Sequence, residues 1–525
     1  MPVQERARTR VAKHPVRRIK FELPGYPHPL SLPTENPDYG TNLFLAVSRD
    51  IPPSPSPLAA SDPADGGRQG RRRKRFGKEP RTDYDARRGN WVMKEIERRQ
   101  FLKTAGMVTG VALTGGMPGI VAARKPPSFP RRTKLHLLQW SSVLKPADDV
   151  HRQLAREFQK LTRVQVTIEA TNPNDLRARI VKAVESGTGP DIIQLLHNWP
   201  HLYANALADV GDVAEPIGQR DGGYYGQGEG ACKVGGRFKA VPFCLVPLAV
   251  VYRTDWFREI GVETFPETWD EYRRVGKQLK ATGRPFGHVL AHSFGDSHAF
   301  LYPLLWSFGG KETEEDGKTI ALFSKETEES IRFCVALFDD ALDEGGVAWD
   351  DISNNRAYLA QTISATLNDA SIYFSAKKQF PKIAKVCRHA PLPTGPAGRF
   401  AWHITQEHAI MKYSKHQQVA KEYLTWLMER EQWAKWSRVQ EGYSTGPTKF
   451  WEQNKMWKTD PKILPFRDIY QYWRHTGYAG PPTAQAAQAL SQHILVDMYA
   501  KAILGASPRQ AIRWAVRKLN KIYKG

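Results

Sequence analysis

The sequence DIIQLL at residues 191–196 is an apolar run that follows a Gly-Pro connection. A short apolar run bounded by turn residues is typical of a strand that is buried on both faces. Two strand-like segments precede it, LHLLQW at residues 135–140 and VQVTIEA at residues 164–170. Apolar residues recur at helical spacing between these strands, in residues 148–161 and 176–184. This βαβαβ order predicts a doubly wound α/β lobe with parallel strands.

The following segments continue the mixture of strands and helices. Residues 237–243 and 248–252 are strand-like, and Gly235-Gly236 just before them predicts a two-residue hairpin turn. Thr268, with Glu271 three residues later, fits the capping box of a helix start. Helical periodicity predicts further helices at residues 326–342, 415–438, 484–503 and 508–523.

Length and charge limit the classes of protein that this chain can belong to. A chain of 525 residues exceeds one typical hydrophobic core, so we expect two domains or lobes. Its 76 Lys and Arg against 54 Asp and Glu give a net charge of +22, which favours anionic surfaces without fixing a partner. After residue 123 no apolar stretch approaches the roughly 20 residues that a membrane-spanning helix needs. We therefore expect the mature protein to be soluble.

The four cysteines are Cys232, Cys244, Cys334 and Cys387, and they are widely spaced. No CxxC pair is present, which argues against a cysteine-based zinc site. Four cysteines allow three disulfide connectivities, and the sequence does not choose among them. No motif calls for a metal or a cofactor, so we expect neither.

Residues 97–103, Glu-Arg-Arg-Gln-Phe-Leu-Lys, stand before a weakly apolar run, rich in Gly and Thr, that ends near residue 123. This arrangement resembles a twin-arginine export signal. The resemblance implies that residues 93–123 are a signal peptide and that the twin-arginine translocase is a partner. A buried or amphipathic helix is the alternative for the apolar run. The signal residues are Arg98, Arg99, Phe101 and Leu102.

Residues 1–92 are rich in Pro and Arg and show no sustained periodicity, so we expect a disordered extension. Met93 stands where a signal peptide would begin. Residues 1–92 are therefore interpreted as upstream sequence or as the product of a mispredicted start. The basic run at residues 71–75 also allows a tail that binds nucleic acid or another acidic surface. Our main prediction includes no nucleic-acid partner.

Five later segments occur in a recognisable order and spacing. They are SGTGPDII at residues 186–193, GRFKAVPF at 236–243, VYRTDWF at 251–257, FPETWDEY at 265–272 and LPTGPAG at 392–398. Together they resemble the extracellular solute-binding proteins of ABC importers, in particular the large family that includes sugar binders. The resemblance covers the chain from about residue 134 to its end.

The resemblance implies a two-lobed α/β fold of the type II periplasmic-binding class, with a solute held between the lobes. We expect one lobe at residues 134–245 and about 402–455. The other lobe, with the C-terminal helices, is expected at about 246–400 and 456–525. The candidate hinges are residues 243–250 and 400–404. The protein would then be periplasmic, and it would deliver a small solute to the permease subunits of an ABC importer.

The candidate ligand-binding residues lie mostly where strands of such a fold end. Trp140 ends the first strand, and Asn198 and Trp199 follow the strand at residues 191–196. The remaining candidates are Phe243, Trp306, Asn368, Asp369, Trp402 and Tyr443. Aromatic faces together with Asn and Asp side chains suit a sugar, because its hydroxyls need hydrogen-bond partners. Packing within the core is the alternative for each tryptophan.

Other functions agree less well with the sequence. The basic charge leaves an anionic solute open, such as a glycerol-phosphate ester. A secreted carbohydrate-active enzyme is a further alternative, because its acid and base can lie far apart in sequence. Glu312 stands where a phosphate-binding loop ending at Lys318 would need Gly. We therefore predict a binding protein without catalytic residues.

Overall fold

A computed structural model describes residues 129–130 and 132–524, all of which belong to one compact unit. The predicted extension at residues 1–92 and the predicted signal peptide at residues 93–123 lie outside the described residues. No helix of the described part is long and apolar enough to cross a membrane. All four cysteines are buried free thiols.

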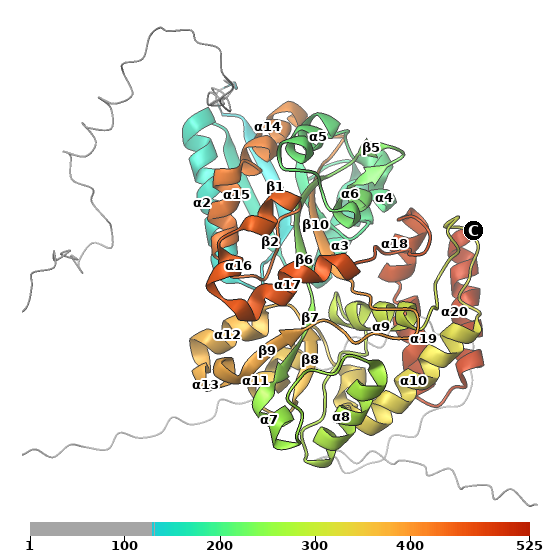
Figure 1. Ribbon diagram of the computed structural model, residues 1–525. Coiled ribbons are helices and arrows are strands. Elements are labelled where there is room, and N and C mark those ends of the chain that lie inside the picture. Colours follow the sequence, from blue (N-terminus) through green and yellow to red (C-terminus); the bar gives the residue numbers. More distant parts are fainter. Residues whose placement is uncertain (1–128, 131, 525) are drawn as a thin grey trace, which may run out of the picture. The chain divides into compact units, whose positions relative to one another are not determined.

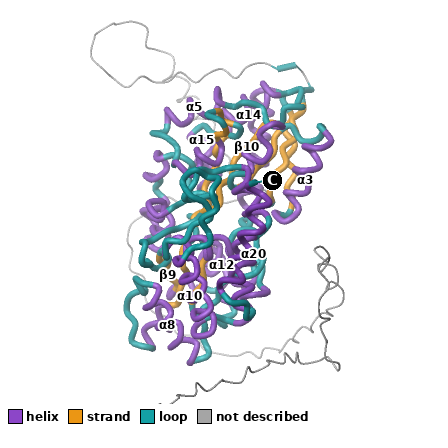
Figure 2. The backbone as a smooth tube through the Cα atoms, turned by 90° about the vertical axis from the view of Figure 1, so that its right-hand side faces the viewer, coloured by secondary structure: helices purple, strands orange, loops and turns teal. Residues whose placement is uncertain are grey.

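The larger sheet has five strands in the order β2-β1-β3-β10-β6. Its members are β1 (Lys134–Trp140), β2 (Gln165–Thr171), β3 (Ile192–Leu196), β6 (Val241–Pro247) and β10 (His403–Ile410). β1 runs parallel to both β2 and β3, as the βαβαβ order predicts. β10 runs antiparallel to both β3 and β6, so a strand from late in the chain lies between two early ones. Figure 2 shows these strands between helices.

The smaller sheet has three strands in the order β8-β7-β9, and both pairs are antiparallel. Its members are β7 (Ala249–Arg253), β8 (Ala365–Asn368) and β9 (Cys387–Ala390). Leu248 alone separates β6 of the larger sheet from β7 of the smaller one. We call the parts built around the larger and the smaller sheet the first and the second lobe (Figure 1). The predicted residue limits of the lobes stay a prediction.

Helices cover both sheets. The helices between the first strands are α2 (Lys145–Thr162) and α3 (Pro173–Ser186). The others are α4 (Trp199–Tyr203), α5 (Gly211–Arg220), α6 (Gly226–Cys232), α7 (Thr254–Glu259), α8 (Trp269–Ala281), α9 (Asp296–Ser307), α10 (Lys325–Ala341), α11 (Ser353–Leu359), α12 (Ser371–Gln379), α13 (Pro381–Val386), α14 (Gln417–Leu427), α15 (Arg430–Arg438), α16 (Met456–Thr459), α17 (Leu464–Asp468), α18 (Ala484–Ser491), α19 (Ile494–Ile503) and α20 (Pro508–Tyr523).

Local signals in the sequence produced the expected elements. β4 (Lys233–Val234) and β5 (Arg237–Phe238) form the predicted hairpin, and the two turn glycines have φ values of 57° and 78°. Positive φ at both turn positions is what a type I′ turn requires, and glycine adopts it without strain. Thr268 and Glu271 form the predicted capping box at the start of α8.

Two of the predicted helices are each divided in two. The helix predicted over residues 415–438 is α14 followed by α15, because Glu429 is extended. The helix predicted over residues 484–503 is α18 followed by α19, because His493 adopts a left-handed conformation with φ 53°. Helical periodicity continues through such breaks, so the pattern of apolar residues does not reveal them.

A buried carboxyl joins the C-terminal helix to the second lobe. Glu312 is 2% exposed, and the hydroxyls of Tyr523 and Tyr302 donate hydrogen bonds to it at 2.8 and 3.2 Å. Tyr523 is the last residue of α20, and Tyr302 lies on α9. Burial raises the pKa of Glu312 to about 7, although both hydroxyls oppose the shift.

Candidate functional site

One edge of the larger sheet carries most of the candidate residues. β1, β3 and β6 end at this edge and the antiparallel β10 begins there, with His403 paired to Pro247. The backbone N–H of His197 donates to the carbonyl of Thr405 at 3.2 Å and extends the ladder beyond β3. Loops that follow the carboxyl ends of strands are where ligands bind in open α/β sheets.

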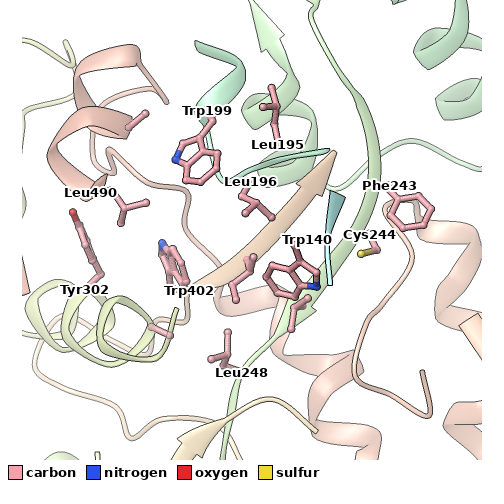
Figure 3. Close-up of a cluster of buried hydrophobic side chains, with 14 of the residues drawn as sticks. Trp140, Leu195, Leu196, Trp199, Phe243, Cys244, Leu248, Tyr302, Trp402 and Leu490 are labelled. Carbon is pink, nitrogen blue, oxygen red and sulfur yellow. The ribbon is translucent and has the colours of Figure 1, made fainter. Parts of the chain in front are cut away.

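Three predicted tryptophans meet at this edge around two residues that were not predicted. Phe294, which precedes α9 of the second lobe, has its ring centroid 5.4 Å from Trp140, 6.5 Å from Trp199 and 5.4 Å from His197. His197 lies 4.9 Å from Trp402. Figure 3 shows the three tryptophans near the start of β10. The aromatic cluster of Trp140, His197, Trp199, Phe294 and Trp402 therefore joins the two lobes.

A second group of predicted residues lies at the end of β8. Asn368 donates from its amide to the Asn355 Oδ1 atom at 2.7 Å. Burial raises the pKa of Asp369 to about 6, and hydrogen bonds from Ser371 and Tyr443 oppose that shift. Tyr443 follows α15 and reaches Asp369 from the side of the first lobe. Asn368, Asp369 and Tyr443 therefore form a polar contact between the lobes.

Phe243 and Trp306 have their main ring contacts outside both groups, although Phe243 lines a cavity of about 20 Å³ together with Trp140 and Tyr443. Phe243 packs on Trp436 with ring centroids 4.6 Å apart, and it points away from the three tryptophans (Figure 3). Trp306 lies on α9 and packs on Tyr302 and Tyr478, each at 5.5 Å. Both contacts are those of core side chains.

Buried polar atoms without a hydrogen-bond partner gather around the aromatic cluster. In the described part of the chain these include the indole N–H of Trp199, the Oδ1 atom of Asn198 and the Nδ1 atom of His197. Both ring nitrogens of His403 are also unpaired. Nearby in the fold, the unpaired atoms include Nδ1 of His298, Nε1 of Trp306, Nε1 of Trp473 and Nδ1 of His493. A buried donor or acceptor without a partner costs about 1–3 kcal/mol, so such atoms are rare unless they serve a purpose.

A cavity of about 10 Å³ lies among these residues. His197, Asn198, Trp402, His403 and Arg474 line it, and its size suits about one water molecule. We call it the interlobe cavity.

An open groove of about 610 Å³ lies beside the interlobe cavity and shares Pro482 with it. Glycines of α6 and of the β4–β5 hairpin line this groove, where Glu229 and Lys233 already pair at 2.8 Å. The groove is the larger space, but its ionic groups already have partners. The interlobe cavity is therefore the stronger candidate for ligand binding, because polar atoms that line it are unpaired.

The imidazoles at the site are neutral at neutral pH. The pKa of both His197 and His403 is lowered to about 3, mainly by burial, and for His403 neighbouring histidines contribute to that shift. Each neutral ring presents one donor and one acceptor. Among the residues that the structure describes, no group of three or more His, Cys, Asp or Glu side chains is arranged to hold a metal ion.

Three residues at the site, His197, Phe294 and Arg474, were not predicted, and the sequence contains only weak indications of their role. His197 directly precedes the predicted Asn198, and its positive φ of 56° turns the chain sharply after β3. Phe294 and Arg474 lie in loops far from the predicted strands, and their place at the site depends on packing between segments that are distant in the sequence.

The chain shares a sequence profile with a known family. The profile described as "Bacterial extracellular solute-binding protein" matches residues 145–432, more than half of the chain. The chain belongs to the family of bacterial extracellular solute-binding proteins. The family resemblance seen in the sequence is thereby confirmed. This family consists of solute-binding proteins.

Curated relatives of this solute-binding protein match at low identity. The diacetylchitobiose-binding protein DasA of Streptomyces coelicolor is 24% identical over 172 residues, which is 32% of this chain and 39% of the relative. A probable ABC transporter-binding protein of Deinococcus radiodurans is 23% identical over 254 residues, or 45% of this chain and 58% of the relative. The matches thus span between about two fifths and three fifths of these relatives.

Solved structures share the fold of this solute-binding protein. Maltose-bound MalE3 of T. maritima superposes with a TM-score of 0.64 at 20% identity, over 74% of this chain and all of that chain. The GacH receptor of Streptomyces glaucescens, solved unliganded and with acarbose, superposes with a TM-score of 0.65 at 16% identity, over 75% of this chain and 99% of that chain. The fold is therefore the two-lobed periplasmic-binding-protein fold that the sequence predicts.

Proposed function

We propose that the protein is the solute-binding component of an ABC importer and captures a sugar or oligosaccharide between its two lobes. In this proposal residues 93–123 are the twin-arginine signal, so the protein works in the periplasm. Its partners are then the twin-arginine translocase during export and the permease subunits in the membrane. The proposed activity is reversible binding without a chemical step.

The unpaired polar atoms beside the aromatic cluster carry this proposal. A sugar ring has apolar faces that stack on aromatic side chains, and its hydroxyls both donate and accept hydrogen bonds. The Trp199 indole offers a donor, Asn198 Oδ1 offers an acceptor and His403 offers one of each. The cavity among them holds only about one water molecule in this arrangement, so a polyhydroxylated ring would pair with these atoms once the lobes open to admit it.

The relatives support a sugar over other solutes. The names of the Streptomyces coelicolor relative and of the Thermotoga structure specify diacetylchitobiose and maltose. A third solved neighbour, a sugar transporter from Arthrobacter chlorophenolicus with bound laminaribiose, has a TM-score of 0.64 at 16% identity. These ligands are stated for those proteins, and their shared chemistry is that of hydroxyl-rich rings.

Calorimetric titration of the full chain with mono-, di- and oligosaccharides tests the proposal, with a thermal-shift screen to choose the ligands. A solute at a hundred times its dissociation constant stabilises the folded protein by about 2.7 kcal/mol. We expect saturable binding of one sugar class, with the ligand recovered unchanged. Recovery of a cleaved or altered sugar would favour a secreted carbohydrate-active enzyme. Failure of every sugar to bind would contradict the proposal.

A further inference from the structure

Arg474 is a half-buried cation that lines the interlobe cavity. Its guanidinium lies over the rings of Phe400 and Tyr478, 5.1 and 5.4 Å from their centroids. Its Nη1 atom donates to the carbonyl of Trp473 at 2.8 Å. Within residues 132–524 it forms no ion pair with a carboxylate. Most of its N–H donors are therefore free to meet a ligand.

Other arginines that lie over aromatic rings in the described chain have their charge neutralised. Arg430 lies 3.7 Å from the ring centroid of Phe450 and pairs with Asp221 at 2.9 Å. Arg253 lies 3.9 Å from the ring of Trp256 and has its own carboxylate partner at 2.7 Å. Arg284 and Arg399 likewise combine a ring contact with an ion pair. Arg474 departs from this pattern.

The surroundings of Arg474 supply no negative charge. None of the described residues that line the interlobe cavity is an aspartate or a glutamate. The neighbouring titratable groups are His403, His197 and His475, and burial lowers the pKa of each. Asp369 belongs to the second group and interacts with Tyr443 instead. A partly desolvated guanidinium next to neutral rings favours an anion as its partner.

We propose that the solute is an acidic sugar whose anionic group, a carboxylate or a phosphate, pairs with Arg474. The inference rests on the proposed function and narrows its solute class. The planar guanidinium matches two oxygens of such a group, which a hydroxyl does not offer. His403, which lines the same cavity, has unpaired ring nitrogens, and its one N–H suits a further oxygen of the solute.

The test compares matched ligands on the full chain by calorimetric titration. Digalacturonate is measured against galactobiose, glucuronate against glucose, and glucose 6-phosphate against glucose. We expect one acidic member to bind on the order of 10- to 100-fold more tightly than its neutral counterpart, which is the range of a charge-assisted hydrogen bond. Preference for a uronate or for the sugar phosphate identifies which anionic group the site recognises.

Variants of Arg474 assign that preference to its charge. Arg474→Gln should weaken binding of the acidic sugar by the same factor of about 10 to 100 and so remove the preference. Arg474→Lys, which keeps the charge but not the two-pronged geometry, should retain part of it, and melting curves check that both variants fold. Arg430→Gln is the control, because it removes a ring-stacked arginine elsewhere.

Three outcomes would overturn the inference. Equal or tighter binding of the neutral sugars would overturn it and leave the proposed function intact. An acidic preference that survives in Arg474→Gln would likewise overturn it. Failure of both neutral and acidic sugars to bind would overturn the inference together with the proposed function.

Discussion

The buried carboxyl of Glu312 makes the stability of the protein depend on pH in a way that one substitution removes. Glu312 receives hydrogen bonds from Tyr523 and Tyr302, and no cation among residues 132–524 pairs with it. We predict that Glu312→Gln stabilises the protein at pH 8 and changes its stability little at pH 5. The amide has nearly the same shape, accepts from one hydroxyl and donates to the other.

The expected magnitude follows from the pKa in the two states. Burial raises the pKa of Glu312 from 4.5 to about 7, so the folded protein holds this proton more tightly than the unfolded chain. The contribution to stability is therefore complete below pH 4.5 and is lost as the pH rises through 7. Each pH unit between these values costs about 1.4 kcal/mol, which gives about 3 kcal/mol in all.

Urea unfolding of the wild type and of Glu312→Gln at several pH values between 5 and 8 measures this difference. The two free energies of unfolding should agree to about 1 kcal/mol at pH 5 and diverge to about 3 kcal/mol at pH 8. Glu314→Gln is the control, because Glu314 pairs with Lys311 at the surface. Parallel pH profiles for the wild type and Glu312→Gln would refute the reasoning.

Three further predictions concern the site and one helix start. Burial lowers the pKa of His403 from 6.5 to about 3. Its contribution to stability is therefore present above pH 6.5 and falls as the pH drops toward 3. In urea unfolding, His403→Gln should lose less unfolding free energy between pH 7 and pH 4.5 than the wild type does. The indole N–H of Trp199 has no partner, whereas that of Trp433 donates to a backbone carbonyl at 2.9 Å. Trp199→Phe should therefore weaken sugar binding and cost about 1–3 kcal/mol less folding stability than Trp433→Phe, which should leave the affinity unchanged; the reverse order would contradict this account. Thr268→Ala removes the capping box of α8 and should cost about 1 kcal/mol of unfolding free energy without changing the affinity for sugar. An unchanged free energy of unfolding in urea would contradict this prediction.

Features set by neighbouring residues were predictable from the sequence. Parallel pairing of β1, β2 and β3 follows from the alternation of strand and helix within residues 134–196. The hairpin turn at Gly235 and Gly236 follows from the need for positive φ. Each of these depends on contacts between segments that are close in the chain.

Features set by distant segments were not predictable in the same way. β10 lies between β3 and β6 although some 150 residues separate it from β6, and nothing in its own pattern specifies those partners. The same limit applies to Phe294, which no strand pattern places beside Trp140. Phe243 shows a different limit: successive strand residues face opposite sides, and the sequence does not say which side of β6 faces the second lobe.

The unpaired atoms at the interlobe cavity connect binding to closure of the lobes. Bringing Phe294 against His197 and Trp140 buries apolar rings, which favours the closed arrangement. The same closure buries His403, Asn198 Oδ1 and the Trp199 indole without partners, at a cost of about 1–3 kcal/mol for each group. These terms oppose each other, so the unpaired groups offset part of what the empty protein gains by closing. A cavity of about 10 Å³ has no room for a sugar, so the lobes must close around a bound solute in a wider arrangement than the empty one. A solute that pairs with these groups removes their cost in that arrangement, and a ligand shifts a conformational equilibrium by its difference in affinity for the two states. Closure driven by the solute thus follows from the polar atoms that the fold itself leaves unpaired.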